Sequence, residues 1–171
     1  MFRILILIIL LLPAKAMSEE NTHYVKGMVL LDDENYRAAE DEFLTFLKDA
    51  PDSSRAYNTL GFIYYKLGEK KKAAEHYEKA LARDSGYATA YNNLGILYYH
   101  EGDYEKAIIC FENAIKYNPC YAKAMINLGL VYLKQGDRES AKKMYRLAKE
   151  KDKEYVSERE RAAQKKYEQA Q

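Results

Sequence analysis

The sequence predicts an all-α fold built from four consecutive helix-turn-helix repeats. A glycine recurs at intervals of 34 residues inside patterns that otherwise indicate helices, at Gly27, Gly61, Gly95 and Gly129. Around each glycine, apolar residues recur at steps of three and four, which is the spacing of one face of an α-helix. The short breaks "LGE", "EGD" and "QGD" provide a glycine to end one helix and an acidic residue to begin the next. A fixed interval of this length indicates a repeated structural unit.

Residues 1–16, MFRILILIILLLPAKA, have the pattern of a secretory signal peptide. Arg3 gives a positively charged start, residues 4–12 are continuously apolar, and Ala-Lys-Ala at 14–16 fits a cleavage site. We therefore expect export, with the bacterial periplasm as the expected compartment. The mature chain would begin near Met17.

A second interpretation of the same residues is a membrane anchor. If cleavage does not occur, the apolar residues 4–12 would tether the chain, although this run is short for a bilayer span. In either case residues 17–19 form a linker to the first repeat.

The four repeats are predicted at residues 20–53, 54–87, 88–121 and 122–155. Alignment on the glycines gives shared alanines at Ala39, Ala73, Ala107 and Ala141, and shared aromatic residues at Phe43, Tyr77, Phe111 and Tyr145. The first repeat departs from the others, because His23 and Lys26 occupy apolar positions and "DDEN" replaces the glycine-acid turn. Such a departure is expected of a repeat at the edge of an array.

The recurring glycine needs a physical reason, because glycine inside a helix costs about 1 kcal/mol relative to alanine. We expect Gly95 to face the small side chain of Ala107, so that the two helices of a hairpin approach closely. The aromatic residues are expected to fill the spaces between neighbouring repeats as core residues.

The pattern resembles the tetratricopeptide repeat, whose signature is W-x2-L-G-x2-Y followed by A, F and P. The stretch "YNNLGILYY" followed by "AIICFENAIKYNP" matches it most closely, with Tyr91 in the tryptophan position. The resemblance covers residues 20–155 and implies a right-handed superhelical array of helix-turn-helix repeats. Residues 156–171 are polar and helix-favouring, and they resemble the capping helix that closes such arrays.

The resemblance also implies a binding surface, because the first helices of this family line a concave groove that receives a peptide or a partner's helix. The groove residues are those that avoid the Leu/Gly/Tyr packing stripe. The predicted partner-binding residues are Asn58, Phe62, Tyr65, Asn92, Asn93, Ile96, Tyr99, Lys123, Asn127 and Leu130, and His100 and Leu133 lie beside them. An asparagine amide both donates and accepts, so it can hold a peptide backbone. In the alternative, these asparagines are solvated or bonded within the scaffold.

Catalysis, cofactors and metals are not expected. The sequence has no phosphate-binding glycine loop, and its histidines lack metal-ligand spacing with Cys110 and Cys120. The two cysteines are expected to be free thiols. A net charge of +1 gives no indication of nucleic-acid binding. A clamp for a chaperone's terminal carboxylate is not expected, because Phe62 and Asn127 replace its asparagine and arginine.

The sequence therefore predicts an exported adaptor that binds another protein or a peptide and is not an enzyme. One alternative is a self-associating structural or assembly subunit of an extracytoplasmic complex, in which the acidic first repeat contacts the basic C-terminal region of a neighbouring copy. Another is a membrane-tethered assembly factor, if the leader stays uncleaved.

Overall fold

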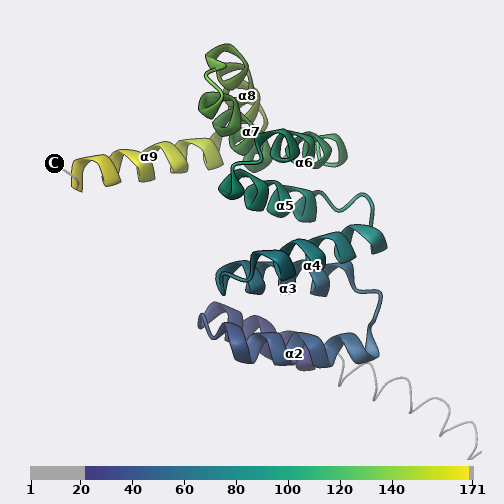
Figure 1. Cartoon of the computed structure of the whole chain (residues 1–171). Helices are drawn as coiled ribbons and strands as arrows, with labels where there is room; N and C mark the ends of the chain where they lie inside the picture. Colours follow the sequence, from purple (N-terminus) through teal and green to yellow (C-terminus); the bar gives the residue numbers. More distant parts are fainter. Residues whose placement is uncertain (1–21, 170–171) are drawn as a thin grey trace, which may run out of the picture. The chain divides into compact units, whose positions relative to one another are not determined.

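The computed structural model describes residues 22–169, in which every regular element is an α-helix (Figure 1). The predicted leader, residues 1–16, and the linker, residues 17–19, lie outside the described residues. After a helical segment at residues 22–32, the helices are α2 (Tyr36–Asp49), α3 (Ser54–Lys66), α4 (Lys70–Arg83), α5 (Ala88–Glu101), α6 (Tyr104–Tyr117), α7 (Ala122–Lys134), α8 (Arg138–Lys151) and α9 (Lys153–Gln169). None of the helices within residues 22–169 has the length and apolar run needed to cross a bilayer.

The chain forms two compact halves. The N-terminal half ends at Ser85 and the C-terminal half begins at Gly86. Within the halves, helices pair with their neighbours in the chain as hairpins, α3 with α4, α5 with α6, and α7 with α8 (Figure 1). The predicted all-α fold of helix-turn-helix repeats is confirmed.

The turns inside the hairpins follow the predicted chemistry. Gly102 ends α5 in the left-handed conformation with φ 82°, and the Asp103 side chain then accepts the Lys106 backbone N–H at 3.2 Å. Hydrogen bonding to Lys106 lowers the pKa of the Asp103 carboxyl. Gly136 and Asp137 repeat this arrangement before α8.

The other two turns differ from that pattern. Glu69 precedes α4 but makes no capping bond, and instead its carboxylate pairs with Arg37 and Lys72 at 2.6 Å each. In the first repeat, Glu34 takes the left-handed conformation, with φ 57°, that glycine takes elsewhere. Asn35 then caps α2 through the Ala38 N–H.

The recurring glycines make room for aromatic rings. A Cβ atom added at Gly95 would lie 2.7 Å from Cε1 of Phe111, whose side chain is buried. The same relation holds between Gly61 and Tyr77, and between Gly27 and Phe43. The expectation that Gly95 faces Ala107 therefore named the wrong contact residue. Instead, the Phe111 ring lies directly over the glycine.

Gly129 is the exception among these glycines. A Cβ atom there would meet the Ala141 carbonyl oxygen at 3.4 Å and the Met144 Cβ at 3.5 Å, which are ordinary contacts. The Tyr145 ring does not cover it, and this side chain is 37% exposed. The residues aligned with Tyr145 in the other repeats are buried, namely Phe43, Tyr77 and Phe111.

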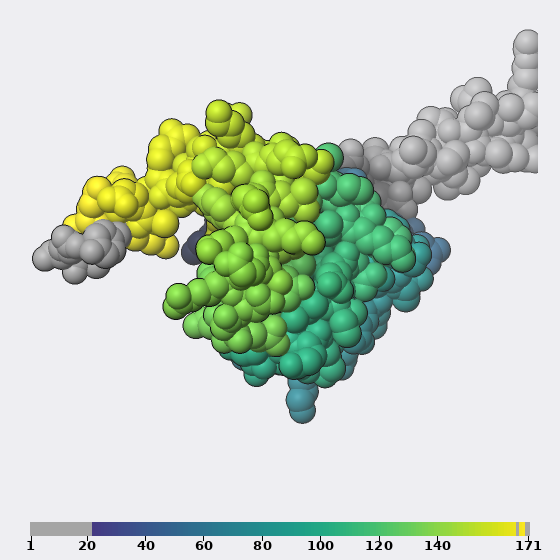
Figure 2. Space-filling view, turned by 90° about the horizontal axis from the view of Figure 1, so that it is seen from above, coloured from purple at the N-terminus to yellow at the C-terminus, as the bar shows by residue number. Residues whose placement is uncertain are grey.

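The core of the C-terminal half joins neighbouring hairpins. Leu128 and Val131 of α7 are buried against Ala107 and Phe111 of α6. At the start of α9, Val156 is buried with Met125 and Ala148. Residues 158–166 of α9 are exposed, and this helix projects away from α7 and α8 (Figures 1 and 2). Only the beginning of α9 therefore contributes to the core.

The glycine contacts predict opposite effects of one substitution at two positions. Gly95→Leu is expected to lower the free energy of unfolding by about 2 kcal/mol or more, because crowding against Phe111 exceeds the gain of about 1 kcal/mol in helix propensity. Gly129→Leu is expected to leave stability unchanged or raise it. Urea unfolding followed by circular dichroism measures both. Equal losses at the two positions would show that the Phe111 ring is not the constraint.

The turn at Glu34 predicts a stabilising substitution. A side chain in the left-handed conformation costs about 1 kcal/mol, so Glu34→Gly is expected to raise the free energy of unfolding by about that amount. Gly102→Ala is the matched control and is expected to lower it by a similar amount. Thermal and urea unfolding of both variants tests the pair, and a destabilised Glu34→Gly variant would contradict it.

Candidate functional site

A surface pocket in the C-terminal half collects most of the predicted groove residues of that half. Its volume is about 270 Å³. The lining consists of Ile96, Tyr99 and His100 from α5, Phe111 from α6, Lys123, Asn127 and Leu130 from α7, and Arg159 from α9. We call it the α5–α7 pocket.

Helical spacing explains why these side chains meet. On α7, Lys123, Asn127 and Leu130 are separated by four and three residues, so they share one face of the helix. The intervening Leu128 belongs to the opposite face, which is buried in the core. Ile96 and Tyr99 have the same relation on α5.

The α5–α7 pocket combines an apolar surface with positive charge at its edge. Ile96 and Tyr99 are half-buried, and Leu130 is exposed. Lys123 is exposed and has no carboxylate partner within residues 22–169. Arg159 donates to the Tyr155 hydroxyl at 3.3 Å. Such a surface suits a ligand with an apolar side chain and a negatively charged group.

One predicted contact residue, Asn92, lies inside the scaffold. Asn92 is fully buried, and its side-chain oxygen accepts a hydrogen bond from the Asn127 amide at 2.9 Å. Its own amide donates to the Asn93 side-chain oxygen at 3.4 Å. Asn92 thus links α5 to α7, as in the alternative in which the asparagines are bonded within the scaffold. Asn127 remains at the pocket surface.

Tyr99 is positioned by its aromatic neighbours. Its ring makes an edge contact with His100 at a centroid separation of 5.3 Å and lies 5.9 Å from Tyr104 of α6. Because α5 and α6 are held by the Phe111–Gly95 contact, the ring is presented on a rigid hairpin.

The N-terminal half carries the other three predicted residues, all on α3. Asn58 is buried, at 8% exposure, and it stands 34 residues before Asn92. Phe62 and Tyr65 are half-buried, and the Lys66 ammonium lies 5.5 Å from the Phe62 ring centroid. Asn58 therefore lies in the scaffold, whereas Phe62 and Tyr65 retain accessible surface.

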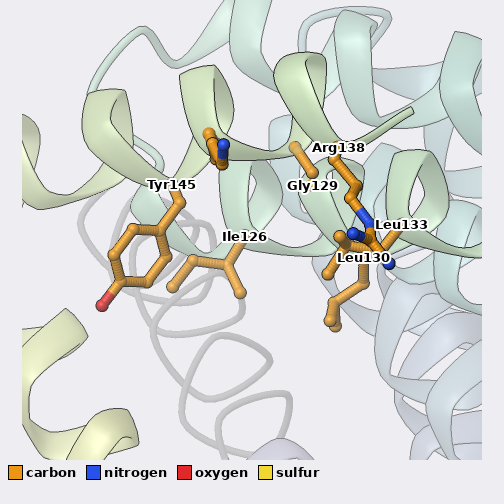
Figure 3. A pocket seen from close by; sticks show the side chains of 8 residues that line it. Ile126, Gly129, Leu130, Leu133, Arg138 and Tyr145 are labelled. Carbon is orange, nitrogen blue, oxygen red and sulfur yellow. The ribbon is translucent and has the colours of Figure 1, made fainter. Parts of the chain in front are cut away.

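A second pocket of the C-terminal half was not predicted. It has a volume of about 310 Å³ and lies between α7 and α8 (Figure 3). The lining consists of Ile126, Gly129, Leu130 and Leu133 from α7 and Arg138, Ala141, Lys142 and Tyr145 from α8. Figure 3 shows the Tyr145 ring at one end beside Ile126, and Leu133 and Arg138 at the other. We call it the end pocket.

Contacts with α9 hold the Tyr145 ring at the edge of the end pocket. The Tyr145 hydroxyl donates to the Glu160 carboxylate, which also pairs with the Lys149 ammonium at 3.2 Å. The hydrogen bond to Glu160 raises the pKa of the Tyr145 hydroxyl, and the same bond lowers the pKa of the Glu160 carboxyl.

The sequence did contain a signal for the end pocket. Tyr104 and Ile108 of α6 pack against the core formed with α7. The residues 34 positions later, Arg138 and Lys142, are charged. The replacement of apolar residues by charged ones indicates that this face of the α7–α8 hairpin is not covered by a further apolar helix. Nothing comparable in the sequence indicated Arg159, because its place in the α5–α7 pocket depends on the direction that α9 takes.

Comparison with known proteins agrees with this geometry. Sequence profiles of the tetratricopeptide repeat match residues 24–88 and 86–154. A search of the curated proteins found no match.

Solved structures give the same result. The crystal structure of MamA is 29% identical and has a TM-score of 0.72, with 81% of each chain covered. The pilF protein of Pseudomonas aeruginosa is 27% identical with a TM-score of 0.74, covering 81% of this chain and 63% of that one. A thermophilic protein of the same repeat class from Thermus thermophilus, TTC0263, is 27% identical with a TM-score of 0.68, covering 78% and 75%. The hairpins, the glycine–aromatic contacts and these matches agree. The chain belongs to the tetratricopeptide repeat family.

Proposed function

We propose that this chain is an adaptor that binds a peptide or a partner's helix in the α5–α7 pocket. Tetratricopeptide repeat proteins are protein-interaction adaptors, and their fold is a non-catalytic scaffold. One observation carries the proposal. Five of the predicted groove residues, from two different helices, line a single pocket: Ile96, Tyr99, Lys123, Asn127 and Leu130.

The chemistry of the pocket indicates the class of ligand. Ile96, Tyr99 and Leu130 offer apolar area, and aromatic residues often anchor interfaces. Lys123 and Arg159 add positive charge at the rim. The ligand is therefore a segment with a large apolar side chain and at least one carboxylate. The Asn127 side chain, with one amide N–H bonded to Asn92, keeps its oxygen available to a ligand's backbone N–H.

Export to the periplasm is part of the same proposal and rests on residues 1–16 alone. The alternative of an uncleaved anchor at residues 4–12 leads to a membrane-tethered assembly factor with the same pocket. Self-association through the acidic first repeat also remains a prediction.

The pocket predicts that Tyr99→Ala weakens ligand binding without unfolding the chain. Peptides selected from a random displayed library against the full chain are expected to carry an apolar residue near Asp or Glu. Loss of the Tyr99 ring should reduce their affinity by about 2 kcal/mol, or roughly 30-fold, as loss of a central aromatic anchor does. Isothermal titration of the variant and the parent chain measures the change.

Charge reversal and a distant control sharpen this experiment. Lys123→Glu should weaken the same peptides and reduce the salt dependence of binding, whereas Glu105→Ala, at an exposed position on α6, should leave affinity unchanged. Peptides that bind both folded pocket variants as tightly as the parent chain would place the binding surface elsewhere.

The leader predicts a defined N-terminus for the exported protein. Expressed with residues 1–16 in a Gram-negative bacterium, the protein should be released by osmotic shock and begin at Met17. N-terminal sequencing gives the answer. An intact Met1 terminus in washed membranes would favour the anchor.

A further inference from the structure

We propose that the end pocket is a docking site for a peptide segment that carries an aromatic side chain next to acidic residues. This inference goes beyond the proposed function, because the end pocket lies between α7 and α8 and has its own ligand chemistry. The two pockets share Leu130, and their other lining residues differ.

The part of the end pocket that lies on Gly129 is called the seat, and its shape follows from the repeat pattern. In the other three repeats an aromatic ring lies over the recurring glycine, with 2.6–2.9 Å between its nearest atom and an added Cβ. The ring in each case is almost fully buried. Among residues 22–169, no ring atom lies within 4 Å of a Cβ added at Gly129, and the end pocket occupies this place. The fold thus forms a ring-sized apolar seat on Gly129, and the seat is open.

The chain's own ring is held away from this seat. The Tyr145 hydroxyl donates to Glu160, and the Lys149 ammonium lies 6.0 Å from the Tyr145 ring centroid. Glu160 also belongs to the exposed part of α9, which projects away from α8. No residue of α9 lines the end pocket among the described residues.

The charged residues at the rim of the end pocket indicate which residues accompany the ligand's aromatic ring. Arg138 and Lys142 stand where α6 has Tyr104 and Ile108, which pack in the core formed with α7. The Arg138 guanidinium has no carboxylate partner within residues 22–169, and Lys142 pairs only with Glu139, whose side chain is 84% exposed. A further apolar repeat would leave these cations buried without partners, whereas a ligand's carboxylates pair with them. The occupant therefore carries carboxylates next to its ring.

The experiment uses the peptide acetyl-Glu-Asp-Phe-Asp-Glu-amide and the full chain labelled with ¹⁵N. Titration is expected to shift the amide signals of Gly129, Leu133 and Arg138. Replacing the peptide's Phe with Ala should weaken binding at least about tenfold, because the ring supplies the apolar contact. Replacing its four acids with lysines should abolish binding, and added salt should weaken the original peptide.

Variants of the chain test the same site. Gly129→Leu fills the seat and should reduce affinity for the Phe peptide at least about tenfold. Leu133→Glu, at a side chain that is 54% exposed, places a carboxylate at the rim without entering the core and should do the same. Arg138→Glu should remove most of the salt dependence. Tyr99→Ala is the matched control in the other pocket and should leave this affinity unchanged.

Three outcomes would overturn the inference. They are no shift at millimolar peptide, shifts centred on Ile96 and Tyr99, or an affinity that Gly129→Leu and Leu133→Glu leave unchanged. Because Tyr99→Ala reports on the α5–α7 pocket, a failure of the end pocket and a failure of the proposed function give different results.

Discussion

The contact between a helix backbone and an aromatic ring determines how the α3–α4 and α5–α6 hairpins are built. Where Gly61 and Gly95 lack a Cβ atom, Tyr77 and Phe111 from the second helix lie directly on the first. The two helices are then fixed in distance and rotation at a point near their middle. Every side chain that the first helix presents to the surface, such as Tyr99, takes its direction from that contact.

The sequence predicted the features that depend on local chemistry. The 34-residue interval, the glycine-acid turns and the three- and four-residue steps indicated the helices and their pairing, because each depends on backbone conformation and on one amphipathic face. The direction of a side chain between two helices is not local. That is why Gly95 was matched to Ala107 rather than to Phe111, and why the exposure of Tyr145 was not predicted.

The candidate site was predictable to a similar degree. Helical spacing placed Ile96, Tyr99, Lys123, Asn127 and Leu130 on one side, and they line one pocket. Spacing does not show whether a polar side chain at such a position reaches water or a neighbouring helix. Asn92 reaches Asn127 and is buried, so it contributes to the scaffold instead of the surface.

The order of the hairpins along the chain also determines how the protein gains and loses its structure. Helices pack mainly against those next to them in sequence, as α6 does with α5 and α7. Bringing such segments together closes only short loops, which favours rapid folding. In the C-terminal half, the α7–α8 hairpin is supported by α6 and by the start of α9, so opening can begin at its end and proceed one hairpin at a time. The α8–α9 end, where Val156 is the last buried residue among those that the structure describes, is the natural starting point for that opening.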